Sequence, residues 1–308
     1  MTTPIQVAIC VATYRRNAQL LRLLKALETL TFRAVSEPDI AVVIVDNDPL
    51  GSGDPAVRAF HSARYRISYY HETRRGISYA RNTAIEAAGD ADFIAFIDDD
   101  EQPSHAWLDR LLAAQLTFAA PIVAGRVVPL LEESSFHFVP VRLRRSSCAT
   151  GTRMQSASTA NVLIASYVLR FMGPEWFDPR YAVTGGEDTH FFRRCLAANI
   201  PIVWADDAIV YESIPPARLT PEYLCARARN GANHWTRVEI ELHGSPVNLA
   251  LRFGVGILRV LQGSTIKFFS RHSDRQQEIA GDLLLAEGVG NLHAFFGGRY
   301  EMYGAIER

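Results

Sequence analysis

The chain has 308 residues, of which 48% are hydrophobic and 21% charged, and its formal net charge is −1. This length and apolar content are enough for one large domain or for a domain with an appendage. A net charge near zero excludes a global field that attracts nucleic acid or anionic membrane, so we expect no nucleic-acid partner and only local membrane contact. The four cysteines show no metal-ligand spacing, which indicates reduced thiols in a cytoplasmic protein.

Apolar runs alternate with helical patterns through the first 120 residues. Residues 7–12 form an apolar run without a basic segment before it, so they are predicted as a first strand rather than a signal peptide. Further strands are predicted at 40–45, 67–70 and 93–97. Helices are predicted after Asn17 as an N-cap, over 78–88 and from Pro103 onward. This alternation predicts a mostly parallel, doubly wound half of the kind that binds nucleotides.

The second half of the chain has a different pattern. Strands are predicted at 122–128 and within 202–212. A helix is predicted after the segment 184–188, with its apolar side formed by residues such as Phe191 and Leu196. The basic, Ser/Thr-rich residues 142–153 are predicted as a loop.

Four consecutive carboxylates, Asp98 to Glu101, follow the apolar run 93–97. If the strand continues through them, Asp98 and Asp100 point to one side and Asp99 and Glu101 to the other. Like charges this close need a cation or hydrogen-bond donors to compensate them. Oxygen ligands at the carboxyl end of a strand suit Mg²⁺ or Mn²⁺, which also hold substrate phosphates. The alternative is a solvated acidic turn.

Five segments resemble, in kind and order, family 2 glycosyltransferases of the GT-A fold: residues 7–16, 43–48, 76–89, 98–100 and 185–188. The resemblance covers roughly residues 5–235, and the segment 210–235 is similar to the bacterial exopolysaccharide branch, including succinoglycan-type transferases. It implies an α/β fold with a mostly parallel central sheet flanked by helices. A catalytic domain is then expected over 1–235, with a nucleotide-binding half at 1–120 and an acceptor half at 121–235, followed by a helical appendage over 236–308.

The resemblance also implies an activity. A single sugar would move, with inversion, from a nucleotide-sugar donor, UDP-linked by expectation, to a saccharide acceptor. That acceptor would be a lipid-linked oligosaccharide, a precursor of a surface polysaccharide. The processive signature Gln-x-x-Arg-Trp is absent, because Arg227, Arg229 and Trp235 have the wrong spacing. One sugar per encounter is therefore expected rather than polymerisation.

Several positions carry implied donor-binding roles. Thr13 and Tyr14 correspond to the end of the first strand, where backbone groups and a ring meet the nucleotide. Asp46 would accept a hydrogen bond from the base or ribose, and Arg81 would contact the donor. An ordinary strand-to-helix turn, turn capping and an exposed helix arginine are the respective alternatives. The full implied donor set is Ala12, Thr13, Tyr14, Arg15, Asp46, Arg81, Asp98 and Asp99.

The resemblance further implies a metal ligand and a catalytic base. Asp100 would hold Mg²⁺ or Mn²⁺, with Glu212 near a position where many relatives have a histidine. Asp188 matches the catalytic aspartate, and Glu187 would bind the acceptor beside it. At a helix start the dipole keeps Asp188 ionised, whereas burial raises its pKa. A capping charge is the alternative. His190 departs from the family, which commonly has an acidic residue there.

Residues 247–270 are apolar but interrupted by Arg252, Arg259 and Lys267, so no uncharged stretch reaches the length of a membrane span. At 100° per residue the three cations fall on one side of a helix. That pattern predicts an interfacial helix on the anionic inner leaflet of the cytoplasmic membrane. The alternative is an amphipathic helix packed on the catalytic domain. A further helix is predicted over 278–297.

Two other functions fit the same fold. A sugar nucleotidyltransferase usually has a Gly-rich phosphate loop after the first strand, and residues 12–16 contain no glycine. A non-catalytic sugar-binding protein is disfavoured because both Asp100 and Asp188 are present at the matching positions.

Overall fold

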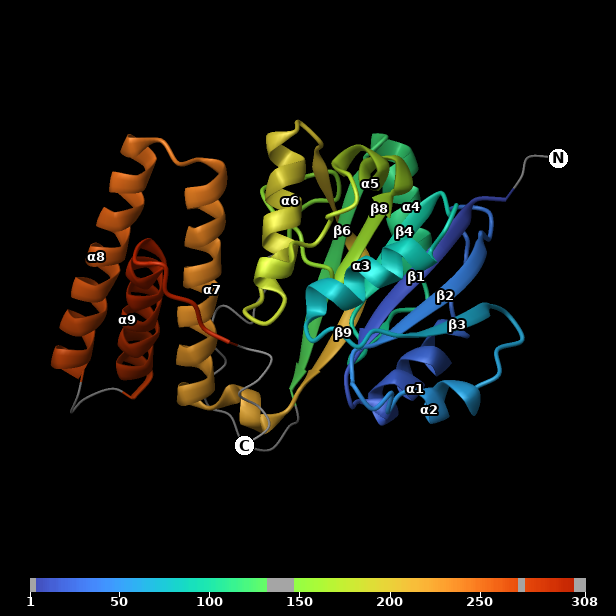
Figure 1. Ribbon diagram of the computed structural model, residues 1–308, viewed down its shortest axis with the longest axis horizontal. Helices are drawn as coiled ribbons and strands as arrows, with labels where there is room; N and C mark the ends of the chain where they lie inside the picture. Colours follow the sequence, from blue (N-terminus) through green and yellow to red (C-terminus); the bar gives the residue numbers. More distant parts are fainter. Residues whose placement is uncertain (1–3, 132–146, 271–274, 302–308) are drawn as a thin grey trace. The chain divides into compact units, whose positions relative to one another are not determined.

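The computed structural model describes residues 4–131, 147–270 and 275–301. The chain divides into two compact units (Figure 1). Unit 1 comprises Met1–Leu130, Val141–Ala182 and Phe191–Ser213, and unit 2 comprises Leu131–Pro140, Val183–His190 and Ile214–Arg308. The domain boundary expected at residue 235 falls inside a continuous helix, α7 (Pro221–Leu242).

Unit 1 is built on a nine-stranded sheet of order β3-β2-β1-β4-β8-β6-β9-β5, with β7 paired to β9. The strands β3, β2, β1 and β4 are parallel, and β8 joins antiparallel to β4. The predicted mostly parallel arrangement of the first strands is therefore confirmed. The strands are β1 (Gln6–Thr13), β2 (Asp39–Asp46), β3 (Arg66–His71), β4 (Phe93–Ile97), β5 (Glu101–Pro103), β6 (Ile122–Leu131), β7 (Arg153–Met154), β8 (Asn161–Ala165) and β9 (Ile202–Ile214).

Side chains alternate along the buried strands, so each face of the sheet has its own core. Val7, Ile9 and Val11 pack with residues of α1 and α4 on one face, whereas Ala8 and Cys10 pack with residues of α3, α5 and α6 on the other. The unit 1 helices are α1 (Asn17–Leu27), α2 (Asp54–Arg58), α3 (Ile77–Ala87), α4 (Trp107–Phe118) and α5 (Ser166–Met172), with a 3-10 turn η2 (Pro179–Tyr181). Helix α6 (Glu187–Ala197) begins in unit 2 and continues in unit 1.

Two predicted helix starts are wrong in detail. Asn17 is the first residue of α1 rather than its cap, and its side chain donates to the Ser52 carbonyl. Pro103 ends the short strand β5, and α4 begins at Trp107. Of the predicted loop 142–153, residues 142–146 lie outside the described part, and Arg153 already belongs to β7.

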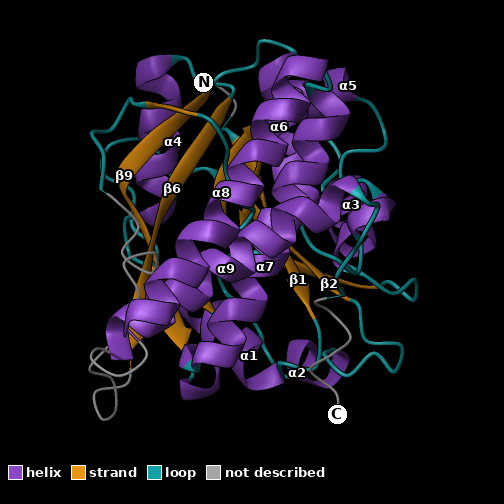
Figure 2. Ribbon diagram, turned by 90° about the vertical axis from the view of Figure 1, so that its left-hand side faces the viewer, coloured by secondary structure: helices purple, strands orange, loops and turns teal. Residues whose placement is uncertain are grey.

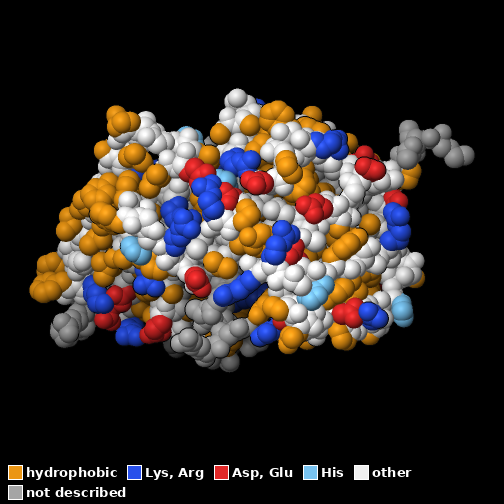
Figure 3. Space-filling model, in the orientation of Figure 1, with side chains coloured by type: hydrophobic (Ala, Val, Ile, Leu, Met, Phe, Trp, Pro, Cys, Tyr) orange, Lys and Arg blue, Asp and Glu red, His pale blue; other side chains and the backbone are white. Residues whose placement is uncertain are grey.

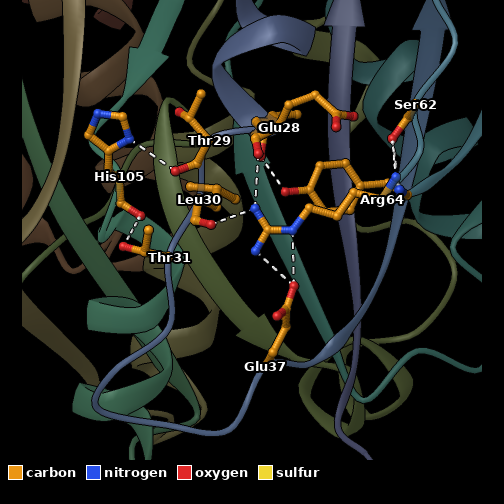
Figure 4. A network of polar contacts seen from close by, with 10 residues as sticks. Glu28, Thr29, Leu30, Thr31, Glu37, Ser62, Arg64 and His105 are labelled. Atoms are coloured by element: carbon orange, nitrogen blue, oxygen red, sulfur yellow. Dashed lines mark hydrogen bonds and ion pairs between the residues drawn. The ribbon is translucent and has the colours of Figure 1, made fainter.

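One polar network secures the loop between α1 and β2 (Figure 4). Arg64 donates to the carbonyls of Glu28 and Leu30, at 2.9 and 2.5 Å, and to the Glu37 carboxylate. His105, ahead of α4, lies 2.9 Å from the Thr29 carbonyl through Nδ1. Because these carbonyls belong to a loop rather than to a strand, the side chains replace the sheet hydrogen bonds that the loop lacks. The network belongs to the scaffold.

Unit 2 contains three long helices, α7, α8 (Pro246–Ser270) and α9 (Arg275–Phe295), after a 3-10 turn η3 (Pro216–Leu219). Helix α9 packs against both α7 and α8 (Figures 1 and 2). The approach of α8 to α9 is close, because a Cβ at Gly263 would lie 2.5 Å from the Leu285 backbone nitrogen. The predicted helix over 278–297 is α9, which begins three residues earlier than the prediction and ends two residues earlier.

The three cations of α8 lie on one side of the helix, as expected, but they do not face outward. Arg252 pairs with Glu239 of α7 at 2.5 Å, and Arg259 and Lys267 pair with Glu287 and Asp282 of α9 at 3.2 and 2.6 Å. Each cation thus has a carboxylate partner within unit 2, and its contact with an anionic leaflet stays a prediction. Their carboxylate partners were not recognised because they lie on the neighbouring helices α7 and α9, and a sequence pattern does not show how such helices pack.

The opposite side of α8 is apolar and exposed, and Figure 3 shows hydrophobic side chains gathered over this helix at the left edge of the view. The exposed apolar residues are Val247, Leu251, Val255, Ile257, Leu258, Leu261, Phe268 and Phe269, which we call the outward face of α8. By length and composition α8 could cross a membrane, and only 11% of its most apolar window is buried. The core helix of a soluble protein would instead be mostly buried.

Candidate donor site and catalytic loop

The acidic residues Asp98 to Asp100 form a turn at the carboxyl edge of the parallel strands. Strand β4 ends at Ile97, and β5 begins at Glu101. The expected alternation of side chains is therefore wrong, because the backbone leaves the extended conformation at Asp98. Asp99 and Asp100 contact the same guanidinium nitrogen instead of pointing to opposite sides.

That nitrogen is Nη1 of Arg16, on the loop between β1 and α1. It lies 2.9 Å from Asp99 Oδ1 and 2.9 Å from Asp100 Oδ2. Thr13, at the end of β1, donates through Oγ1 to the other Asp99 oxygen at 2.7 Å. Burial raises the pKa of Asp99 to about 6, although Arg16 opposes the shift and Asp100 adds to it. Two adjacent carboxylates thus share one cation, which compensates their mutual repulsion.

Glu101 is structural. Its side chain is buried and accepts a hydrogen bond from the Asp98 backbone nitrogen at 3.0 Å. Burial, followed by the charge of Asp98, raises the pKa of Glu101 well above its usual value. Glu212 lies directly opposite Glu101 in the β5–β9 pairing, and its charge raises this pKa further. The structure thus places Glu212 beside the acidic turn, and a metal-ligand role for it stays a prediction.

Asp46, at the carboxyl end of β2, has the contacts of the capping alternative. It is fully buried, and its carboxylate accepts hydrogen bonds from the backbone nitrogens of Asp48 and Gly53 and from the Tyr69 hydroxyl, at 2.7–2.9 Å. Burial, and then the Asp46 contact, raises the pKa of Tyr69. Because Asp46 is fully buried, nothing here shows a nucleotide contact, and that role stays a prediction.

The loop after β1 presents exposed side chains beside the turn. Tyr14 is exposed, and the Arg15 guanidinium lies over its ring at 5.1 Å from the centroid. Arg15 also pairs with Asp48 at 3.3 Å, and its φ of 53° lies in the left-handed region. Ala12 and Thr13 precede this loop within β1. An exposed ring and a guanidinium at the sheet edge are suited to a base and a phosphate.

Arg81 is not an exposed helix arginine. Its side chain, on α3, is only 7% exposed, and Nη2 lies 3.4 Å from Asp98 Oδ1. The guanidinium also lies over the Phe177 ring, at 5.8 Å from the centroid. The exposed-arginine alternative is therefore wrong, and because the buried guanidinium contacts Asp98, a direct donor contact by Arg81 stays a prediction.

Unit 2 carries the candidate catalytic loop. Thr184 is held by α7, because Asn230 donates to its carbonyl at 2.9 Å. Gly186 has a φ of 93°, and a Cβ there would lie 2.6 Å from the His234 side chain.

Asp188, in the first turn of α6, is partly exposed and accepts a hydrogen bond from the Thr189 nitrogen at 2.6 Å. Glu187 is buried, and the departure at His190 places its Nε2 3.3 Å from Glu241 of α7.

His234 of α7 lies beside this loop. Burial lowers the pKa of His234, and the nearby Asp188 charge partly offsets that effect. The structure thus places the His234 side chain and the Asp188 carboxylate close together in unit 2.

Sequence reasoning missed Arg16 and His234. Arg16 follows Arg15 directly, and nothing in the spacing distinguishes which of the two guanidinium groups reaches the acidic turn. His234 is separated from Asp188 by more than 40 residues, so no local motif connects them. Asn47 was also missed, although an asparagine in a strand-end loop is a recognisable signal. It donates to the carbonyls of Glu72 and Arg74 and orders the segment before α3.

A parallel half-sheet extended by antiparallel strands, with an acidic turn at its carboxyl edge, defines a class of fold. The same fold occurs in the mannosyltransferase PcManGT from Pyrobaculum calidifontis, solved in complex with GDP-Man and Mn²⁺, with a TM-score of 0.59, 18% identity and coverage of 95% of this chain and 88% of that one. It also occurs in Staphylococcus aureus TarS 1–349 with UDP-GlcNAc, with a TM-score of 0.51, 14% identity and coverage of 96% and 93%. The fold is therefore of the GT-A type.

Sequence comparison gives the family. The family model described as Glycosyl transferase family 2 matches residues 8–158. The succinoglycan biosynthesis protein ExoM of Rhizobium meliloti (strain 1021) is 30% identical over 255 residues, which cover 79% of this chain and 78% of ExoM. Glycosyltransferase AglE of Haloferax volcanii is 27% identical over 215 residues, covering 67% and 66%. The chain belongs to glycosyl transferase family 2 and is a glycosyltransferase, which confirms the resemblance drawn from the five segments.

Proposed function

We propose that the protein transfers a single sugar, with inversion, from a nucleotide-sugar donor to a saccharide acceptor, and that the donor diphosphate binds at the acidic turn of unit 1. The observation that carries this proposal is the pair Asp99–Asp100, held together by one cationic nitrogen at the carboxyl edge of the sheet. Two solved GT-A neighbours are complexes with GDP-Man and UDP-GlcNAc, which supports a nucleotide-sugar donor as the class of substrate.

The acidic turn also fits a divalent cation. The potential ligands are carboxylate oxygens, and the Arg16 guanidinium already places a positive charge between two of them. Such oxygens suit Mg²⁺ or Mn²⁺, and PcManGT was solved with Mn²⁺. Asp100 would be the principal ligand, with Glu212 as the second candidate. When bound, the ion would supply charge neutralisation for the departing diphosphate.

Asp188 would act as the base. The acceptor hydroxyl oxygen forms the new bond to the anomeric carbon, the bond from that carbon to the diphosphate breaks, and the diphosphate leaves with the electron pair. The hydroxyl proton passes to a carboxylate oxygen of Asp188, in the first turn of α6. Glu187 would hold an acceptor hydroxyl, Tyr14 and Arg15 would contact the nucleotide, and Arg81 would keep Asp98 in place.

The exposed apolar face of α8 supports a proposal for the cellular location and for the acceptor. We infer that its outward face inserts into the apolar layer of the cytoplasmic membrane, on the inner side, where a lipid-linked saccharide is presented. All three cations of α8 are paired with carboxylates of α7 and α9, so the exposed apolar side chains stand on a face without charge. Such a face is complementary to hydrocarbon, and a close glycine contact such as that of Gly263 is common between membrane helices. The similarity to ExoM supports a polysaccharide precursor as acceptor.

The donor part is tested by calorimetry with a panel of nucleoside diphosphates and nucleotide sugars, with and without Mn²⁺. We expect one nucleotide to bind with metal dependence, and Asp100→Ala to weaken that binding by about tenfold or more, which corresponds to about 1.4 kcal/mol. Asp206→Ala is the matched control, because Asp206 lies on β9 and contacts Arg126, Trp204 and Ser147 instead. Equal affinity of wild type and Asp100→Ala, with and without Mn²⁺, contradicts the metal assignment.

A further inference from the structure

Arg16 contacts the same two carboxylates, Asp99 and Asp100, at which a divalent ion is proposed to bind. Its Nη1 lies at the same distance, 2.9 Å, from an oxygen of Asp99 and from one of Asp100. The two carboxylates differ in how firmly they are held. Asp99 also accepts the Thr13 hydroxyl and is 5% exposed, whereas Asp100 is 15% exposed. Asp100 is therefore the more accessible of the two.

A guanidinium N–H and a divalent ion compete for the same lone pairs. Nη1 donates to Asp100 Oδ2, so an ion that binds this oxygen has to displace the N–H from it. The Arg16 side chain is 35% exposed and long enough to move without unfolding the loop. Its contact with Asp99 can persist while the contact with Asp100 is lost.

We propose that Arg16 is an internal substitute for the metal ion, which neutralises Asp100 in the metal-free protein and releases it when a divalent ion and a nucleoside diphosphate bind together. This inference rests on the proposed metal-dependent donor binding at Asp100. The diphosphate provides the anion that the released guanidinium needs, because Arg16 belongs to the same loop as Tyr14 and Arg15. Arg16 thus makes the metal alone bind weakly and couples its affinity to that of the nucleotide, and such coupling is reciprocal.

The test measures Mn²⁺ binding directly, by the loss of the free-ion signal in electron paramagnetic resonance, without any turnover. Wild type and Arg16→Gln are titrated with Mn²⁺ alone and then with saturating UDP or GDP. We expect Arg16→Gln to bind Mn²⁺ alone about tenfold more tightly than wild type, because the competing donor is gone. The gain in Mn²⁺ affinity on adding the nucleotide should be smaller in the variant than in wild type.

Two further variants make the outcome decisive. Arg15→Gln removes the same charge from the same loop, but Arg15 pairs with Asp48, so Mn²⁺ affinity without nucleotide should change less than threefold. Arg16→Lys keeps a cation at the position and should stay closer to wild type than Arg16→Gln. Thermal unfolding shows whether each variant is folded. If Arg16→Gln does not fold, the Mn²⁺ affinity of Arg16→Lys is compared with that of wild type instead.

The outcomes separate this inference from the proposed function. If Mn²⁺ alone binds Arg16→Gln no more tightly than wild type, or if Arg15→Gln gives the same gain, Arg16 is not a substitute cation. Nucleotide-dependent Mn²⁺ binding by wild type in that case leaves the proposed function standing. If Mn²⁺ binds no variant under any condition, both the inference and the metal part of the proposed function fail.

Discussion

Both units contain ion pairs between side chains, but the pairs differ in which partner is exposed. In unit 1, Asp99 and Asp100 gather at the carboxyl edge of the sheet, and their partner Arg16 is partly exposed. In unit 2, the cations of α8 are directed toward α7 and α9, and two of their partners, Glu239 and Glu287, are buried. In unit 1, the partly exposed Arg16 can be replaced by another cation. In unit 2, the ion pairs leave the outward face of α8 without charge.

The difference explains why similar sequence features have different consequences. Carboxylates that end a parallel strand lie at the edge where ligands bind, and their compensation by an arginine is reversible. Cations spaced along an apolar helix, in contrast, are placed by the helices that pack on it. A buried ion pair is costly to open, because each charge then lacks its partner in a poorly solvated site. Unit 1 is therefore suited to binding ions, and unit 2 to contact with an apolar phase.

Asp188 is the proposed base, and its substitution should have the largest effect. Asp188→Asn keeps the shape and the Thr189 contact but removes the base. We expect sugar transfer to fall by roughly 10²–10⁴-fold while donor affinity changes little. Transfer rates and calorimetry on the same preparation measure the two quantities. A wild-type transfer rate would make Asp188 structural and Glu187 the candidate base.

The sequence predicted the parallel half of the sheet well, because continuous apolar runs such as 93–97 specify buried strands without reference to the rest of the chain. It predicted the helical start at Glu187 for the same local reason. The direction of side chains at Asp98 to Asp100 was missed, since a turn and a strand have similar composition there. The partners of Arg252 and Arg16 were missed because pairing between different helices and loops depends on tertiary packing.

The second prediction breaks an inward pair of unit 2. Glu287→Gln removes the buried partner of Arg259, whose side chain is 36% exposed, and we expect unit 2 to lose about 2 kcal/mol of unfolding free energy, the scale of a hydrogen bond to a charged group. Glu278→Gln, on the same helix, is the matched control. Glu278 pairs with the exposed Arg275 at 3.5 Å, so the loss should be below about 1 kcal/mol. Urea unfolding compares the two, and equal losses would contradict the distinction between inward and surface pairs.

The third prediction concerns the outward face of α8. Leu258→Glu places a charge on this exposed face, so stability should change by less than about 0.5 kcal/mol. Vesicle flotation should fall by about tenfold or more, because a charge is costly in the apolar layer. Leu116→Glu, at an exposed leucine of α4, is the matched control and should float as wild type does.

Salt and oligomeric state distinguish the alternatives for this face. Binding through apolar contact should persist in high salt and on neutral vesicles, whereas binding through Arg252, Arg259 and Lys267 would be screened. If Leu258→Glu instead converts a dimer to a monomer in light scattering and wild type does not float, a second copy of the chain covers the face.

The smallest effect is expected at Glu72–Arg74, an ion pair of unit 1 whose arginine is largely exposed. Glu72 is buried and accepts hydrogen bonds from Arg74 and Thr83, and the Arg74 contact, against the opposing effect of burial, lowers the pKa of Glu72 to about 2. Because Arg74 is largely exposed, water screens the pair, and we expect Glu72→Gln to cost about 1 kcal/mol at pH 7. A lowered pKa in the folded protein stabilises it above the unfolded pKa of about 4.5, and this contribution disappears as the pH falls toward 2. Urea unfolding of wild type and variant should therefore show a smaller difference in unfolding free energy at pH 3 than at pH 7. A difference that stays constant with pH would mean that the glutamate acts through its shape and not through its charge.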